Sequence, residues 1–171
     1  PPATPSAEPA TVRVAVKPGP LFSFREASIL NQAPPPTVRH DKVALPQDEG
    51  FEPGEIARSG VILRAERLAV EAWRQQGYAK AAAAERRVVA AHDADVIDAR
   101  IAIEPGRRAA YGPVGVQGTE RMDPEFVRYM TGLPQGEEYD PDDLKRAKDR
   151  LARLDVFRSL RIQEDEEIGA D

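Results

Sequence analysis

Two histidines are the side chains of this sequence best suited to acid–base chemistry, and each is followed directly by an aspartate. The pairs are His40-Asp41 and His92-Asp93. Adjacent residues on an extended chain point to opposite sides, so neither pair is placed to form a catalytic dyad. No serine stands in a nucleophile-elbow context, and no zinc-protease or phosphate-loop motif occurs. We expect both histidines to lie in loops and the protein to have no catalytic residue. A small hydrolase that uses His40 or His92 is the alternative.

Two acidic clusters have the residue types of a cation site but lack its spacing. Asp140, Asp142 and Asp143 have neither the central glycine nor the terminal glutamate of a calcium loop. With Pro141 among them, they are typical of a helix N-terminus capped by Asp140. The acidic run at residues 164–167 is expected at a solvated hairpin tip. Because the chain also has no cysteine, thiolate zinc sites are excluded, and we expect no metal and no cofactor.

The composition restricts the class of protein further. The chain has 171 residues, of which 41% are hydrophobic and 31% charged, with a net charge of −5. This length fits one ordinary domain or two small ones with packed cores. The acidic balance argues against bulk nucleic-acid binding, which needs clustered positive charge. No apolar run approaches the roughly 18 residues of a membrane span, and no signal peptide is recognisable. We expect a soluble piece of a longer protein.

Proline is unevenly distributed along the chain. Eleven of the 16 prolines lie in the first 53 residues. Residues 1–10 have the composition of a linker, because proline and small polar residues cannot form a core. Residues 32–55 contain three consecutive prolines and few apolar residues. They are predicted to form an extended surface loop with at most a short helix.

An internal repeat organises the remaining sequence. Residues 12–29 match residues 99–116 at an offset of 87, which places VRVAVKPG over ARIAIEPG and Phe24 over Tyr111. In both copies, β-branched residues alternate with others before a Pro-Gly pair. This pattern predicts a strand with one buried face that ends in a turn. Each copy then continues into a second, short extended segment.

A second similarity predicts a helix after each copy. At an offset of 79, residues 65–75 and 144–154 share apolar positions with spacings of three and four, which form one stripe on a helix. We attribute the difference between the two offsets to an insertion in the first copy. In the second copy, Asp123 and Pro124 start an additional short helix that Gly132 ends.

The first copy also shows how the unit closes. Residues 78–91 lead to a turn at residues 92–95, and residues 96–103 return as a strand whose alternate positions are apolar. Residues 79–91 have strong local helix propensity, but the repeat favours a strand there, and propensity is weak against tertiary context. The predicted unit is strand, short helix, long helix, strand, strand.

A unit of this order, repeated in tandem, resembles the polypeptide-transport-associated (POTRA) domain. The residues that carry the resemblance are the strand–Pro-Gly–strand junctions at 12–24 and 101–111, the loop 131–137, Asp140-Pro141, and the ending ARLDVFRSLRI at 152–162. The resemblance covers about residues 11 to 165. It implies an α+β fold in which two helices pack on a three-stranded mixed sheet. The pattern is similar to the arms of BamA/TamA-type outer-membrane assembly factors, and the long first copy is most similar to the TamA-like group.

The resemblance also implies a division of the chain. Residues 1–19 would be a linker and the last strand of a preceding unit, and residues 20–106 a complete unit with its insertion near 32–55. Residues 107–171 would be a unit that lacks its last strand. A membrane β-barrel is expected C-terminal to these units in the parent chain. We expect that the missing strand can be replaced by strand exchange between chains, with residues 12–17 of a neighbour.

The function implied is that of a non-enzymatic interaction arm on the periplasmic face of the bacterial outer membrane. Its partners would be unfolded outer-membrane protein clients, or a periplasmic or inner-membrane protein, which add a strand to a sheet edge. No nucleic acid is expected. The edge strands would be residues 79–89 and 158–163. Their expected contact residues are Ala81, Ala83, Glu85, Arg87, Val89, Arg158, Leu160 and Ile162.

Two alternatives remain open for the function. The same fold occurs in the arm of two-partner secretion transporters and in cell-division proteins. A KH-like nucleic-acid module also packs neighbouring helices on a three-stranded sheet. The latter is disfavoured, because the GxxG backbone clamp is absent and the net charge is negative.

Overall fold

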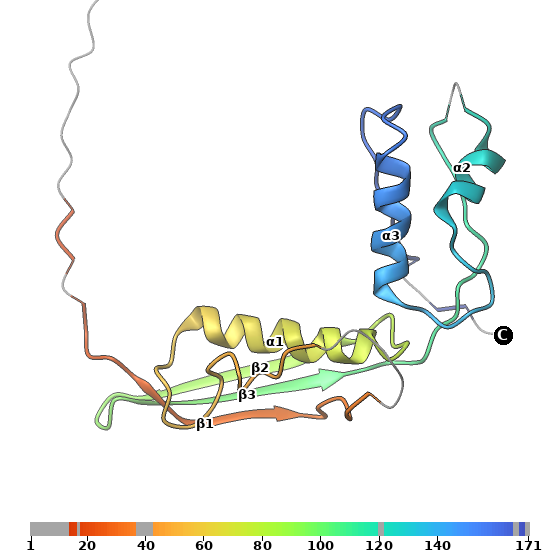
Figure 1. Cartoon of the computed structure of the whole chain (residues 1–171). Coiled ribbons are helices and arrows are strands. Elements are labelled where there is room, and N and C mark those ends of the chain that lie inside the picture. Colours follow the sequence, from red (N-terminus) through yellow and green to blue (C-terminus); the bar gives the residue numbers. More distant parts are fainter. Residues whose placement is uncertain (1–13, 17, 37–42, 120–121, 166–167, 170–171) are drawn as a thin grey trace, which may run out of the picture.

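A three-stranded mixed sheet with one helix across it forms the first part of the molecule (Figure 1). The computed structural model describes residues 14–16, 18–36, 43–119, 122–165 and 168–169. The sheet contains β1 (Ser23–Leu30), β2 (Ala82–Ala91) and β3 (Val96–Glu104), and α1 (Ser59–Arg74) covers it. The strand order is β1-β3-β2, with β3 parallel to β1 and antiparallel to β2. The predicted α+β class with a three-stranded mixed sheet is confirmed.

The alternation of residues in β3 decides which face of the sheet is buried. Ala99, Ile101 and Ile103 are at most 4% exposed. They pack against α1, whose apolar residues recur with spacings of three and four. The residues between them, such as Arg100, lie on the opposite face, which no helix of the described residues covers. The predicted buried face of this strand is confirmed.

β2 is a strand although its sequence favours a helix. It pairs antiparallel with β3 along its whole length, and residues 92–95 form the hairpin turn. Alanine's helix propensity amounts to tenths of a kcal/mol per residue, so the ladder with β3 outweighs it. The strand starts later than expected, because residues 78–81 form a turn in which the Ala81 N–H donates to the Tyr78 carbonyl at 3.0 Å.

The proline-rich segment between β1 and α1 packs on the sheet through one aromatic residue. Phe51 is 2% exposed, and its ring meets that of Phe24 edge-to-face with centroids 5.4 Å apart. The described parts of the segment, residues 32–36 and 43–55, contain turns and no helix. The predicted loop is therefore confirmed there, but it also contributes to the core.

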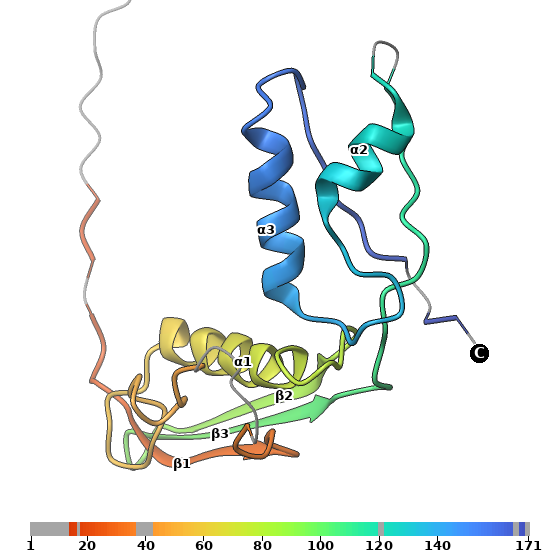
Figure 2. The ribbon, with the colours of Figure 1, turned by 45° about the vertical axis from the view of Figure 1, so that its right-hand side comes forward.

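Two further helices, α2 (Pro124–Thr131) and α3 (Pro141–Ala152), pack against each other beside the end of α1 (Figure 2). Their starts follow the sequence signals. The Asp123 carboxylate accepts from the Glu125 N–H at 2.9 Å, and Asp140 caps α3 in the same way. Gly132 ends α2 at φ +57°, a left-handed conformation that glycine adopts at low cost. Of the helices in the described residues, none has the length and apolarity needed to cross a bilayer.

The internal repeat is visible in backbone hydrogen bonds. Phe24 donates to the carbonyl of Glu55 and accepts from the N–H of Gly54, at 2.9 and 2.7 Å. Tyr111 makes the same two bonds, at 2.9 and 2.8 Å, with the pair Glu137 and Gly136. The predicted equivalence of Phe24 and Tyr111 is confirmed.

The helices of the two copies have a different offset from the predicted one. They begin at an offset of 82 residues, from N-cap Arg58 to N-cap Asp140, and they end at an offset of 78. Ala65 and Ala147, both 0% exposed, are equivalent at the first of these offsets. The single offset of 79 is wrong, because α1 has 16 residues and α3 has 12, a difference of about one turn.

Residues 158–163 are extended, but they are not a strand. Leu160 and Ile162 are partly buried, while Arg158 and Arg161 are exposed, so the predicted alternation is present. The described part of the chain brings no second strand beside this segment, and a ladder needs a partner. The prediction of a sheet strand here is wrong for this structure.

For the N-terminal strand predicted at residues 11–19, the structure describes only part of the segment. The described residues of this segment, 14–16 and 18–19, have no strand conformation, and the others lie outside the described part of the chain. The domain limits at residues 19, 20, 106 and 107 stay predictions.

Candidate functional site

The outer edge of β2 is the most accessible backbone surface of the sheet. β2 occupies one end of the strand order, and no strand of the described residues pairs with its outer side. Because successive N–H and C=O groups of a strand point to opposite edges, about half of those of β2 point outward. The outer edge of β1 differs, because residues 54–57 bond to Phe22 and Phe24 and form a bridge to Ser23.

A bulge divides the expected contact residues of β2 between two faces. Ala83 pairs with Ile103, and Glu85 pairs with Ala102, so one extra residue lies between them. Ala83 is therefore on the face that α1 covers. Glu85, Arg87 and Val89 are on the open face, directly opposite Ala102, Arg100 and Asp98. Ala81, which is 8% exposed, lies in the turn before the strand, so the expected contact residues from 81 to 89 do not share one face.

An apolar strip lies between β2 and α1. Arg86 of β2 donates to Glu66 of α1 at 2.8 Å, which joins the two elements. α1 runs in the direction of β1 and therefore opposite to β2, because it starts beside Phe22 and ends beside Asn31. Leu63, one turn before Glu66, thus comes to the level of Val88; these side chains are 47% and 45% exposed.

The open face of the sheet carries paired charges. Arg25 bonds to Asp98 through two nitrogens, and Arg100 bonds to Glu26 at 2.7 and 2.9 Å. The arginine hydrogen bonds hold the pKa of both carboxylates below their usual values. Arg87 is also exposed on this face, and no ion pair to it is found among the described residues.

The end of α1 is joined to the helical part of the chain by a buried tyrosine. Tyr139 is 5% exposed, and burial raises its pKa, so that its hydroxyl stays protonated. This hydroxyl accepts from Arg74 of α1 and donates to Glu164 at 3.0 Å. Arg74 also donates directly to Glu164, at 2.6 Å. We call these three side chains the junction cluster.

Glycine permits the close approach at this junction. The Ala109 N–H donates to the Gly77 carbonyl at 2.9 Å, and Gly77 has φ +86°. A Cβ at this position would displace the side chain of Glu138, and the positive φ itself favours glycine. Beside it, the Arg108 guanidinium lies 5.6 Å from the centroid of the Tyr78 ring. The sequence predicted none of these contacts.

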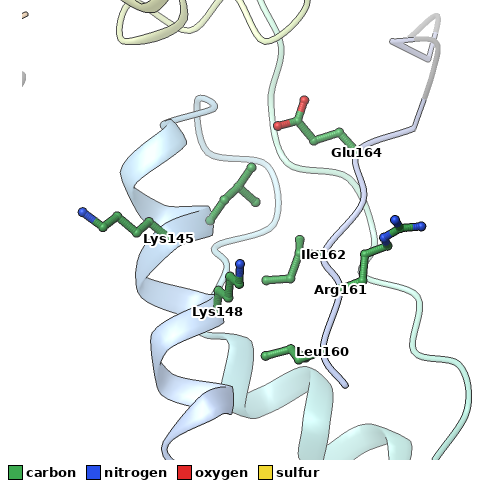
Figure 3. A pocket seen from close by; sticks show the side chains of 7 residues that line it. Lys145, Lys148, Leu160, Arg161, Ile162 and Glu164 are labelled. Carbon is green, nitrogen blue, oxygen red and sulfur yellow. The ribbon is translucent and has the colours of Figure 1, made fainter. Parts of the chain in front are cut away.

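The other expected edge, residues 158–163, lines a groove of about 400 Å³ beside α3. Figure 3 shows Leu160 and Ile162 pointing towards α3 and Arg161 pointing away from it. Leu144 and Lys148 of α3 complete the wall opposite them. Arg158 is exposed at the start of the segment.

The described residues do not bring together side chains that could form a catalytic or metal site. His92 lies exposed in the hairpin turn, and its ring meets that of Phe22 edge-to-face at 5.3 Å. His40 lies outside the described residues. Within the described ranges there is no group of three or more His, Cys, Asp or Glu side chains that could hold a metal ion.

Comparison with known proteins identifies the fold. The chain is similar to the crystal structure of POTRA domains 3–5 of BamA from Haemophilus influenzae, with a TM-score of 0.69 and 15% identity over 88% of this chain and 57% of that one. It is also similar to BamA from Haemophilus ducreyi lacking POTRA domains 1–3, with a TM-score of 0.54 and 14% identity over 78% of this chain and 25% of that one. No family model and no curated protein matches the sequence.

The fold is therefore of the POTRA type seen in BamA, and the predicted resemblance is confirmed at this level. The chain spans 57% of the first of these structures and a quarter of the second. At this identity the likeness defines the fold, and the function must be argued from the geometry of the sheet edge.

One sequence signal could have located the junction cluster. Residues 50–57 read GFEPGEIA and residues 132–139 read GLPQGEEY, which match at an offset of 82. The match contains Phe51 of the sheet core and ends at Tyr139 of the junction cluster. It gives the offset at which the two long helices begin.

Proposed function

We propose that this chain is a periplasmic interaction arm of an outer-membrane protein assembly factor, and that it binds an extended segment of a client or partner along the outer edge of β2. The observation that carries the proposal is the ten-residue strand β2, which among the described residues is paired on one side only and whose half-exposed Val88 lies on the side of α1. The POTRA fold supports it. We also propose that the chain belongs to the TamA-like group, because its first copy contains the long proline-rich segment.

The chemistry of such binding is that of the backbone. An added strand exchanges main-chain hydrogen bonds with β2, which are the same for every sequence, while alternate side chains meet the two faces. This tolerance suits a protein that handles many unfolded clients. Each contact is weak, and several units in one arm supply avidity. No enzymatic step is involved.

Within β2, the contact residues proposed are Ala83, Glu85, Arg87 and Val89. For residues 158–163, the proposed contacts are fewer than the sequence predicted. Leu160 and Ile162 point towards α3, so a partner there would meet the backbone and Arg158, not these two side chains.

The proposal is tested by proline at two consecutive positions, Val88 and Val89. Successive N–H groups of a strand point to opposite edges, so one of the two prolines removes an outward donor and the other removes a bond to β3. The outward-facing variant should stay folded and bind a strand-forming client peptide at least about fivefold more weakly, since a hydrogen bond contributes roughly 1 kcal/mol. Titration calorimetry measures the binding, and circular dichroism measures the fold.

Each of the two proline variants, at Val88 and at Val89, serves as the control for the other. The variant that breaks the β2–β3 ladder should lose stability, which identifies it independently of binding. If the other, stably folded variant binds the peptide as tightly as the unchanged chain, β2 is not the binding edge.

A further inference from the structure

A like-charged pair lies across β2 and β3 on the open face of the sheet. Arg87 and Arg100 are direct neighbours in the antiparallel ladder. Like charges at such positions destabilise a sheet, while opposite charges stabilise it. Arg100 is neutralised from the β1 side, where Glu26 bonds to it through both carboxylate oxygens.

For Arg87, the described part of the chain supplies no such partner. It stands in the edge strand, so the position that would face it from beyond is on a strand added to β2. Glu85 shares its face two residues away, and no ion pair joins the two among the described residues. The side chain is therefore an exposed cation next to another arginine, at the point where a partner's side chain would arrive.

The opposite face of the same edge has a different character. There Val88 and Leu63 are half-exposed beside α1, next to the ion pair between Arg86 and Glu66. A strand added to β2 would place alternate side chains on this face and the intervening ones on the open face, because side chains alternate with a period of two. One strand would thus meet the apolar side chains of Val88 and Leu63, beside a neutralised ion pair, on one side and the Arg87 cation on the other.

We propose that the β2 edge selects amphipathic strands that carry a carboxylate facing Arg87 and apolar residues on either side of it. This inference rests on the proposed function and names the chemistry of its partner. Alternation of apolar and polar residues is also the pattern of outer-membrane strands, which agrees with clients of that class.

The test uses two synthetic strand peptides that differ in one residue. Both have seven residues, with valine at the odd positions and threonine at the second and sixth. The central residue is glutamate in one peptide and lysine in the other. Valine then faces the apolar strip while the central residue faces Arg87. A cross-strand charge pair at an exposed edge should make the glutamate peptide bind about two- to fivefold more tightly.

Charge reversal at one position gives the second arm of the test. In Arg87→Glu the preference should invert in favour of the lysine peptide. Arg107→Glu makes the same change of charge at an exposed arginine outside the sheet and should leave the preference as it is. In about 1 M salt both preferences should shrink, since the Debye length falls to about 3 Å.

The outcomes separate this inference from the proposed function. If both peptides bind equally, and Arg87→Glu changes neither, the edge binds strands without reading charge and the inference is overturned. If neither peptide binds the unchanged chain, the proposed function fails and the inference fails with it. Inversion in Arg87→Glu but not in Arg107→Glu supports both.

Discussion

Two tyrosines connect the loop before α3 to the rest of the molecule. Tyr139 bonds to Arg74 and Glu164 in the junction cluster. Tyr111 donates to the backbone carbonyl of Asp140 at 2.6 Å and accepts from its N–H at 3.1 Å. Both hydroxyl groups are used as neutral donors. Burial raises the pKa of Tyr111 to about 12 and that of Tyr139 well above its usual value.

These shifts predict a loss of stability in alkali. The folded-state pKa of each tyrosine exceeds the unfolded value of about 10, so the unfolded chain releases these protons first. The contribution to stability is complete below about pH 10 and decreases as the pH rises towards 12. Thermal unfolding measured at pH 9, 10 and 11 should show this decrease, and Tyr111→Phe should make it shallower.

A control for this prediction is Tyr129→Phe. Tyr129 is 80% exposed on α2, so its removal should leave the slope of stability against pH unchanged. An equal slope for Tyr111→Phe and the unchanged chain would contradict the role given to Tyr111.

At the scale of elements, the proline-rich segment contributes to the core and covers the outer edge of β1. It brings Phe51 onto Phe24 and lets residues 54–57 bond to the outer side of β1. The same bonds recur in the second copy around Tyr111. The segment therefore occupies one sheet edge, which leaves β2 as the edge available to a partner.

Removal of the Phe51 ring tests this role. Because the ring is 2% exposed within the core, Phe51→Ala should lower the free energy of unfolding by about 3–5 kcal/mol. Leu45→Ala in the same segment removes a side chain that is 53% exposed and should cost about 0.5 kcal/mol or less. Urea unfolding measures both, and equal costs would show that the segment does not pack as described.

The extra turn of α1 is the element that makes the junction possible. Counted from their N-caps, α1 and α3 correspond as far as Val70 and Ala152, and residues 71–74 have no counterpart. This turn contains Trp73, whose ring nitrogen donates to the Asn31 carbonyl at 2.8 Å, and Arg74 of the junction cluster. The length difference between the copies therefore has a direct structural consequence.

At the scale of the whole molecule, the junction cluster joins the sheet part to the helical part. Arg74 comes from α1, Tyr139 from the loop before α3, and Glu164 from the extended segment after α3. Lys80 reinforces it with a bond to the Asp165 carbonyl. In the proposed arm of successive units, such contacts would set the direction in which the edges of the sheets point.

Arg74→Ala should loosen the orientation of the two parts without unfolding either. The absence of native cysteine allows spin labels at two introduced cysteines, one at Glu85 in β2 and one at Lys145 in α3, both exposed. The distance distribution between the labels should broaden in Arg74→Ala. It should stay narrow in Arg107→Ala, whose side chain is exposed. An unchanged width in Arg74→Ala would show that the cluster does not fix the orientation.

The sequence by itself determined the features that depend on neighbouring residues. Asp123 and Asp140 cap their helices with bonds to N–H groups two residues away. The alternation in β3 sorted its buried and exposed residues, and the repeat identified the equivalence of Phe24 and Tyr111 and the POTRA resemblance. Each of these follows from interactions within a few residues, or from a pattern that the chain shows twice.

The tertiary structure decided whatever requires a distant partner. β2 is a strand because β3 lies beside it, and the bulge that moves Ala83 to the other face is a property of that pairing. Residues 158–163 have a strand's alternation without a ladder, because an alternating pattern specifies a face but not a neighbour. Tyr139 follows Arg74 by 65 positions and precedes Glu164 by 25. Only the packing of the sheet against the helical part brings the three side chains within hydrogen-bonding distance.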